Sequence, residues 1–357
     1  MIEAGKPRLL KERNQNMIEA LVLQEGPITK PELADMTMLS VPTVNKIVAQ
    51  LQEAGRIKPV EISNESKLGR KAIHYEGNES AVNVITVFYL NGKWIADVFN
   101  YKGCSIYRKI ADVNVSSLEK TLQGFYELLD ILAEQAVNLQ AIGVGIPGVV
   151  ATNGEIMSCA SIPVWSGLNL KEEMEKKYQC PIFVENDVNL MALGYSKILP
   201  KKPADLVFLF LGQGVGAGII INHRLHKGFS NFAGDFSYLE ASSEEDFQFR
   251  KIERDLNHIQ GRIEREPDNK KLRTQYYQII SKILISCITS LNPEEIVIHG
   301  LALEKEEAQE YLRCKMEACI PKRCNPKILI DPYDEYGVYG LSYQCLSEVT
   351  PKYYLEE

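Results

Sequence analysis

Residues Leu211–Leu239 have the sequence LGQGVGAGIIINHRLHKGFSNFAGDFSYL. Glycine occupies every second position from 212 to 218, an apolar run follows, and a polar segment ends in Ala233-Gly234-Asp235. Because only glycine lets a backbone approach a ligand without a Cβ in the way, this pattern is typical of a loop beside a phosphate or a polyhydroxylated ligand. The alternative interpretation is a tight hairpin between two packed strands.

Composition limits the classes of protein to consider. The chain has 357 residues, which suits two or three domains, and its hydrophobic fraction of 45% and charged fraction of 24% are those of a globular protein. No apolar run is long enough to span a membrane and the N-terminus lacks the apolar stretch of a signal peptide, so we expect a cytoplasmic protein without a membrane partner. The net charge is −7, and residues 1–80 carry as many acidic as basic side chains. Nucleic-acid binding therefore has to be argued from pattern rather than from charge.

The first part of the chain has the spacing of three short helices followed by a hairpin. Thr29-Lys30-Pro31-Glu32 has the form of a capping box with proline in the first turn. Ser40 is a second N-cap residue, and apolar residues recur after it at helical spacing until Gly55. Two short apolar strands that enclose a polar tip follow. We predict a winged helix-turn-helix DNA-binding domain over residues 1–76, with a small helical protein-interaction domain as the alternative.

The exposed face of the helix after Ser40 is small and capable of hydrogen bonding near its N-terminus. A helix that enters a major groove needs such a face to reach the base edges. The wing and its base carry cations suited to phosphates or to a minor groove. The residues that we expect to contact duplex DNA are Ser40, Pro42, Thr43, Asn45, Lys46, Lys67, Arg70 and Lys71. Two heads on a two-fold axis would read an inverted-repeat operator, so we expect a homodimer or a tetramer.

Residues 77–82 form a short polar linker, after which apolar strands alternate with helical segments. The strands that we expect cover residues 84–90, 95–100, 141–148, 182–184, 206–211, 217–222 and 296–298. The expected helices cover residues 118–137, 244–264 and 272–291, with a further one starting at 186. This alternation predicts an α/β fold whose ligands bind at strand ends.

Three motifs in this region resemble those of the ROK family of bacterial sugar kinases and sugar-responsive repressors. VGIPG at 144–148, with its sequel IPVWSGLNL at 162–170, is similar to the family's first glycine turn. ENDVNLMALG at 185–194 is similar to its most characteristic signature, and the stretch from Gly212 to Asp235 is similar to its second-lobe signature. The resemblance covers nearly the whole chain, and three motifs in this order behind a winged head are specific.

The resemblance implies an α/β body of two actin-like lobes, of the hexokinase or ribonuclease H-like type, with a sugar site in the cleft. We expect the first lobe over residues 83–198, completed by a C-terminal helix at 334–357, and the second over 199–333. In the kinases, the aspartate matching Asp187 takes the proton from the attacking sugar hydroxyl, and the asparagine matching Asn186 bonds the sugar. Helix capping is the alternative role for this pair. The expected ligand-binding residues are Gly148, Asn186, Asp187, Asp235 and Tyr238.

The chain departs from the kinase pattern where the family holds phosphate and zinc. The phosphate turn D-x-G-G-T is replaced by FYLNG at 88–92. Because phosphoryl transfer depends on positioning and charge neutralisation, this change predicts loss of kinase activity, with Asp187 as a vestigial base. It also favours the hairpin interpretation of residues 212–218.

A charged insert over 240–273 replaces the cysteine-rich zinc loop, and Tyr238 stands where the family commonly has histidine. We therefore expect no zinc and no cofactor. The cysteine cluster at 314, 319 and 324 is too widely spaced for usual zinc ligands and has no histidine close behind it.

These observations predict a DNA-binding transcriptional regulator of carbohydrate metabolism, acting as a repressor and controlled by a sugar or sugar derivative. Asp235 is shorter than the family's glutamate and Tyr238 is bulkier than its histidine, so the ligand should differ from the usual hexoses in size or position. Two alternatives remain open. One is an ATP-dependent hexose kinase that carries a DNA-binding head, and the other is a dimer scaffold that binds DNA without any small ligand.

Overall fold

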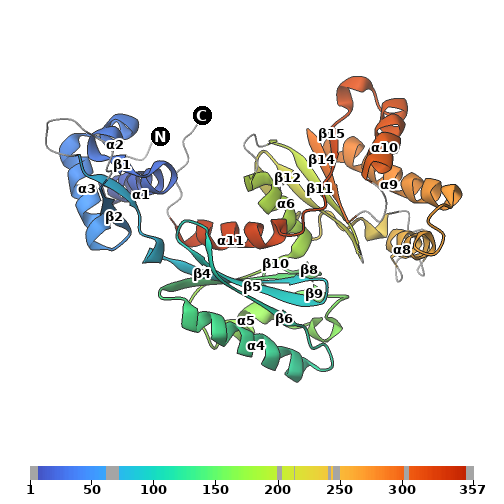
Figure 1. Cartoon of the computed structure of the whole chain (residues 1–357), viewed down its shortest axis with the longest axis horizontal. Helices are drawn as coiled ribbons and strands as arrows, with labels where there is room; N and C mark the ends of the chain where they lie inside the picture. Colours follow the sequence, from blue (N-terminus) through green and yellow to red (C-terminus); the bar gives the residue numbers. More distant parts are fainter. Residues whose placement is uncertain are drawn as a thin grey trace. The chain divides into compact units, whose positions relative to one another are not determined.

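The computed structural model describes residues 7–61, 72–198, 203–212, 214–239, 243, 250–300 and 305–350 (Figure 1). The chain divides into two compact units. The first unit holds Met1–Gly143, Glu175–Phe183 and Ser342–Glu357, and the second holds Val144–Met174 and Val184–Leu341.

The first unit begins with a head of three helices and a small antiparallel sheet of order β1-β3-β2. Its elements are α1 (Pro7–Glu25), β1 (Ile28–Thr29), α2 (Lys30–Thr37), α3 (Val41–Glu53), β2 (Ile57–Val60) and β3 (His74–Gly77). The predicted capping box is present, because Thr29 accepts a hydrogen bond from the Glu32 amide and the Glu32 carboxylate accepts one from the Thr29 amide. Apolar residues of the three helices, such as Leu33 and Val44, are fully buried in one core. The predicted winged helix-turn-helix architecture is therefore confirmed over the described residues.

The sheet that follows has the order β10-β7-β4-β5-β6. Its strands are β4 (Asn83–Leu90), β5 (Lys93–Asn100), β6 (Ser105–Asp112), β7 (Leu139–Ile146) and β10 (Ile182–Asn186). β4, β5 and β6 form an antiparallel meander, and α4 (Leu118–Gln135) lies along one face of it (Figure 1). Phe125 and Leu129 of α4 are fully buried because this helix is apolar on the side that meets the sheet.

The second unit contains a sheet of order β13-β12-β11-β14-β15. Its strands are β11 (Leu206–Leu211), β12 (Val215–Ile221), β13 (Arg224–His226), β14 (Glu295–His299) and β15 (Lys327–Ile330). Successive side chains of a strand point to opposite faces, so Val207 and Leu209 join the core formed with α8 (Lys251–Ile263), α9 (Lys270–Leu291) and α10 (Lys305–Cys319). Phe208, which points the other way, packs against Tyr195 of α6 (Asp187–Ile198) at a ring distance of 5.9 Å.

Two glycines let α6 and α11 (Tyr336–Val349) touch backbone to backbone. A Cβ on Gly194 would lie 1.9 Å from the carbonyl oxygen of Tyr336, and a Cβ on Gly340 would lie 1.9 Å from that of Leu190. Any larger residue at either position would push the helices apart. This contact fixes the start of α11 against the helix that begins at Asp187.

Short strands, a short helix and 3₁₀ turns connect these sheets and helices. They are β8 (Val149–Val150), β9 (Ile156–Ser158), α5 (Leu170–Glu175) and the 3₁₀ turns η1 (Glu79–Ala81), η2 (Pro163–Trp165), η3 (Phe236–Tyr238) and η4 (Lys322–Cys324). β8 and β9 pair with each other as a separate two-stranded ribbon.

A buried polar cluster joins the head to the first sheet within the first unit. Glu19 of α1, which is almost fully buried, accepts hydrogen bonds from Arg56 Nε at 2.5 Å and from the hydroxyl of Tyr101. Arg56 lies shortly after the end of α3 at Glu53, and its Nη2 donates to the Tyr101 hydroxyl at 2.8 Å. Its guanidinium lies 4.5 Å from the centre of the Tyr101 ring. Tyr101 belongs to the turn between β5 and β6, so the cluster connects α1, the end of α3 and the first sheet.

Candidate functional site

The N-terminal end of α3 is an exposed surface capable of hydrogen bonding. Ser40, Pro42, Asn45 and Lys46 are solvent-exposed, and Thr43 is half-buried. The opposite side of the helix is held in the core by side chains that are at most 4% exposed, namely Val44, Ile47, Val48 and Leu51. The five predicted DNA contacts at this helix therefore lie together at its N-terminal end.

Ser40 and Thr43 also hold the helix itself. Ser40 Oγ accepts a hydrogen bond from the Thr43 amide at 3.4 Å, and the two hydroxyl groups lie 2.8 Å apart. These bonds satisfy one of the free amides of the first turn, so both side chains help to hold the start of the helix. The predicted wing residues Lys67, Arg70 and Lys71 lie outside the described residues.

In the second unit, the end of β10 and the start of α6 place Asn186 and Asp187 side by side. Asn186 Nδ2 donates to the carbonyl oxygen of Gly148 at 2.9 Å and to Asp187 Oδ1 at 3.1 Å. Asn186 Oδ1 accepts from the amide of Asn189 at 3.0 Å, and Asp187 Oδ1 accepts from the amide of Val188 at 2.9 Å. The pair therefore caps α6 and ties it to the glycine turn at Gly148. Both interpretations of this pair, capping and ligand contact, are compatible with these bonds.

Burial raises the pKa of Asp187 to about 7, although the Val188 amide favours the charged form. A carboxyl group loses water on burial, and its ionised form loses more stabilisation than its protonated form. Next to it along the chain, Glu185 is buried and accepts from the Asn186 amide at 2.9 Å and from Asn189 Nδ2 at 3.0 Å. Its other oxygen forms an ion pair with Lys227. The sequence interpretation did not include Lys227, because a single lysine in a polar turn carries no distinguishing signal.

The second set of predicted ligand residues lies at η3. Gly234 approaches β12 so closely that a Cβ on it would lie 1.9 Å from the carbonyl oxygen of Ala217, and its own carbonyl accepts from the Ala217 amide at 2.8 Å. This contact, with φ of 95° at Gly234, fixes Asp235 beside the sheet. Asp235 Oδ1 accepts from the amide and the hydroxyl of Ser237 and so caps η3. The Tyr238 ring lies 5.6 Å from that of Phe232.

Two residues of the charged insert join this site and were missed by sequence reasoning. Arg250 Nη2 reaches Ser158 Oγ at 3.5 Å, and its guanidinium lies 5.8 Å from the Tyr238 ring centre. Arg250 also interacts electrostatically with Asp235 and Glu253, and its Nη1 lies 3.6 Å from Glu253 Oε2. Burial raises the pKa of Glu253, and Arg250 opposes that rise. A charged helix looks the same in sequence whether its charges face water or a site, so the pattern could not single them out.

The glycine run of β11 and β12 forms a tight hairpin. Leu211 pairs with Val215, and the Gly212 amide donates to the carbonyl of Gly214 at 3.0 Å. A Cβ on Gly214 would lie 3.9 Å from Glu253 Oε2, so a carboxylate stands next to this turn. The hairpin interpretation is confirmed.

The turn between β4 and β5 is the segment that the sequence analysis compared with the phosphate turn of the kinases. It has two residues, Asn91 with φ of 50° and Gly92 with φ of 81°, and Leu90 pairs with Lys93 across it. Positive φ at both central residues is typical of type I′ hairpin turns with the sequence Asn-Gly. Tyr89 packs edge-on against Trp94 at 5.6 Å beside this turn. The segment is thus a short hairpin with large aromatic side chains rather than a glycine cradle.

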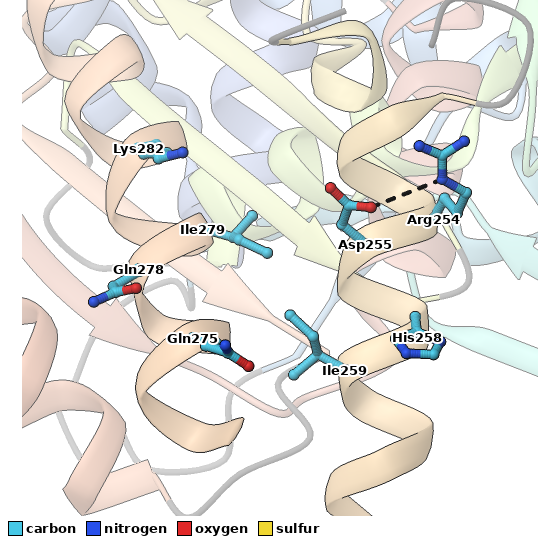
Figure 2. Close-up of a pocket in the computed structure, with 8 residues that line it drawn as sticks. All are labelled: Arg254, Asp255, His258, Ile259, Gln275, Gln278, Ile279 and Lys282. Carbon is cyan, nitrogen blue, oxygen red and sulfur yellow. Dashed lines mark ion pairs between the residues drawn. The ribbon is translucent and has the colours of Figure 1, made fainter. Parts of the chain in front are cut away.

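A separate groove of 520 Å³ lies between α8 and α9 (Figure 2). Figure 2 shows side chains from the two helices facing each other across it, with Arg254 and Asp255 3.8 Å apart on α8. The lining residues are Arg254, Asp255, His258, Ile259, Gln275, Gln278, Ile279 and Lys282. None of the predicted site residues lines this groove.

Two matches to family models agree with this geometry. A model described as winged helix-turn-helix DNA-binding matches residues 16–75, and the ROK family model matches residues 93–249. The chain carries a ROK family domain preceded by a winged helix-turn-helix domain. The resemblance that the three motifs indicated is therefore confirmed.

The curated relatives of this chain include sugar repressors. It is 26% identical over 251 residues to the xylose repressor of Caldicellulosiruptor bescii, a match that covers 68% of this chain and 62% of the repressor. It is 27% identical over 252 residues to the DNA-binding transcriptional dual regulator NagC of Escherichia coli, covering 67% of this chain and 60% of that protein. The matches thus span about three fifths of the length of these relatives.

Solved structures support the fold of this chain. A ROK family transcriptional regulator, homologue of the E. coli MLC protein, superposes with a TM-score of 0.71 at 19% identity, covering 94% of this chain and 96% of that one. The ROK hexokinase of Thermus thermophilus superposes with a TM-score of 0.61 at 20% identity, covering 75% and 99%. At these identities the likeness establishes the fold alone, and it confirms the predicted combination of a winged head with a sugar-kinase-like body.

Among the residues that the structure describes, no three His, Cys, Asp or Glu side chains are grouped so that they could hold a metal ion. Within the same part of the chain, no helix combines the length and the apolar character needed to cross a membrane.

Proposed function

We propose that this chain is a DNA-binding transcriptional regulator of carbohydrate metabolism and that it acts as a repressor. The observation that carries the proposal is the exposed end of α3, where Asn45 and Lys46 are exposed on a helix whose opposite side is buried in a winged helix-turn-helix core. Such an end can reach base edges in a major groove. Relatives named as xylose and N-acetylglucosamine repressors support the same role.

The ROK body supports the effector part of the proposal. Asn186, Asp187 and Asp235 lie in one unit and provide a carboxamide beside carboxylates, which offer both donors and acceptors to vicinal hydroxyl groups. A sugar or sugar derivative bound there would control DNA binding by two heads of a homodimer at an inverted repeat. The Asn-Gly hairpin between β4 and β5 argues against phosphoryl transfer.

The test uses the full-length chain to select duplexes from a pool with a random 30-base-pair centre. We expect enrichment of an inverted repeat. Asn45→Ala should then weaken binding to the selected duplex by about 1–3 kcal/mol and relax base preference, since a bidentate contact to a base is worth that much. Gln52→Ala is the matched control, because Gln52 is exposed on the last turn of the same helix.

Two results would count against this function. A pool without any enriched sequence after repeated rounds would exclude sequence-specific binding. Equal losses for Asn45→Ala and Gln52→Ala would show that the N-terminal end of α3 does not read the bases.

A residual sugar kinase is the second candidate, and one observation favours it. Asp187, at the position of the family's catalytic base, has a pKa raised to about 7 by burial, and a general base works best with a pKa near the operating pH. Sugar-dependent ATP turnover by the purified chain that disappears in Asp187→Asn would establish this activity. We expect no turnover above the Asp187→Asn background.

A further inference from the structure

Three large apolar side chains are exposed around the turn that leads into α3. Met38 is 89% exposed, Val41 is 52% exposed and Met36 is 48% exposed. Single exposed apolar residues are ordinary on protein surfaces, but three within six positions beside a functional helix form a patch. None of the three contributes to the core of the head.

The backbone conformation of Met38 is one that favours glycine, so folding alone does not explain a methionine at this position. Met38 is the residue after α2 and adopts the left-handed conformation, with φ of 56° and ψ of 24°. Glycine adopts this conformation without steric penalty and is the usual residue at such a helix end. A methionine here carries backbone strain while its side chain stays in water. Strain retained without a packing benefit indicates a role in contact with another molecule.

The surroundings of the patch indicate what that molecule is. Val41 is the first residue of α3, and exposed Ser40, Asn45 and Lys46 adjoin it. Hydrogen-bonding groups and a cation around a small apolar patch match a major groove, where the base edges and phosphates are polar and the thymine C5-methyl is the one apolar group. We infer that Met38 and Val41 contact thymine methyl groups and so select thymine in each operator half-site. This inference rests on the proposed DNA binding.

Deleting one methyl group at a time tests the inference without altering the protein. The probe is the most enriched duplex selected from the random pool by the full-length chain, resynthesised with deoxyuridine in place of thymidine at single positions. We expect at least one position per half-site where loss of the methyl weakens binding about fourfold, the equivalent of one buried methylene-sized group. The paired variants are Val41→Ala and Met38→Gly, and each should bind the thymine duplex more weakly and be insensitive to deoxyuridine at one such position.

Two controls separate contact from structure. Val137→Ala removes the same atoms from a valine that is 86% exposed in a loop after α4, and it should retain full sensitivity to every deoxyuridine. Met38→Gly removes the left-handed strain, so it should unfold at an equal or higher denaturant concentration than the unmodified chain while binding DNA more weakly. A merely structural role for Met38 would change both properties in the same direction.

Three outcomes would overturn the inference while leaving DNA binding intact. One is a selected duplex that tolerates deoxyuridine at every position. Another is a methyl effect that persists unchanged in both Val41→Ala and Met38→Gly. The third is a shift in sedimentation of these variants without DNA, which would assign the patch to contact with a second copy of the chain. Failure to enrich any duplex would instead remove the proposed function itself, and the inference with it.

Discussion

At the scale of single residues, the carboxyl group of Asp187 lies in an environment that opposes its ionisation. Its carboxyl group accepts hydrogen bonds from Asn186 and from the Val188 amide, yet burial raises its pKa to about 7. The ordinary value of this side chain is 3.8. Between these two pH values the folded chain therefore holds a proton that the unfolded chain releases, and stability falls as the pH rises through this range.

Asp187→Asn should accordingly stabilise the chain at pH 8 and have little effect near pH 4. We expect the free energy of unfolding to rise by about 1–2 kcal/mol at pH 8, less than the full conversion of the pKa shift, because the carboxyl group keeps some contact with water. Denaturant unfolding at pH 4, 6 and 8 measures this. Exposed Asp112→Asn is the control and should show no such trend. An Asp187→Asn variant that is less stable at pH 8 than at pH 4, relative to the unmodified chain, would contradict the account.

Sequence reasoning was most successful for residues whose roles are local. Thr29 and Ser40 were identified as caps from their own neighbours, and the structure shows both capping bonds. Asn186 and Asp187 were identified from a resemblance, and the structure gives them capping bonds that the sequence could only offer as an alternative. Arg250 and Glu253 were missed, since their role depends on which side of α8 faces Asp235, and only tertiary packing decides that.

At the scale of elements, the sequence predicts those helices and strands that carry a clear apolar pattern and misses those that do not. Strands with apolar runs, such as β4 and β11, and the long helices α4 and α9 were predicted near their observed positions. β6 was not, because it is the edge strand of its sheet and alternates exposed with half-buried side chains. An edge strand buries too little to leave an apolar pattern. α10 and β15 were also missed, because α10 has low mean hydropathy and β15 is short.

The cluster of Glu19, Arg56 and Tyr101 is the element contact most open to a direct test. The buried Glu19 carboxylate raises the pKa of Tyr101 together with burial, the larger cause, so the phenol remains a hydrogen-bond donor. Because Arg56 follows α3, this cluster holds the end of that helix to the turn between β5 and β6.

Tyr101→Phe should lower the free energy of unfolding by about 1–3 kcal/mol, because it leaves a buried carboxylate with one donor fewer. Denaturant unfolding of the full chain measures the loss. Tyr107→Phe on β6 is the matched control, since its hydroxyl forms no hydrogen bond with the described residues, and it should change stability little. Equal effects of the two changes would show that the cluster does not stabilise the junction.

At the scale of the whole molecule, the proposed function couples DNA binding by the winged head to ligand binding near Asp187. Such a chain can act as a regulator only if its ligand has different affinities for the DNA-binding and the released state. By linkage, a sugar that weakens DNA binding by a given factor is itself bound more weakly by the same factor when DNA is present. The effect of the sugar can therefore be measured either as a change in DNA affinity or as a change in sugar affinity.

The most direct test measures the affinity of the full-length chain for its selected duplex, by fluorescence anisotropy, with and without each member of a panel of sugars, amino sugars and sugar phosphates. We expect at least one compound to change that affinity by about tenfold, within the usual range of coupling between sites. We also expect Asp187→Ala to bind the duplex normally but to lose the response. A panel without any effect, or a response that survives undiminished in Asp187→Ala, would contradict the claim that this body senses a polyhydroxylated ligand through Asp187.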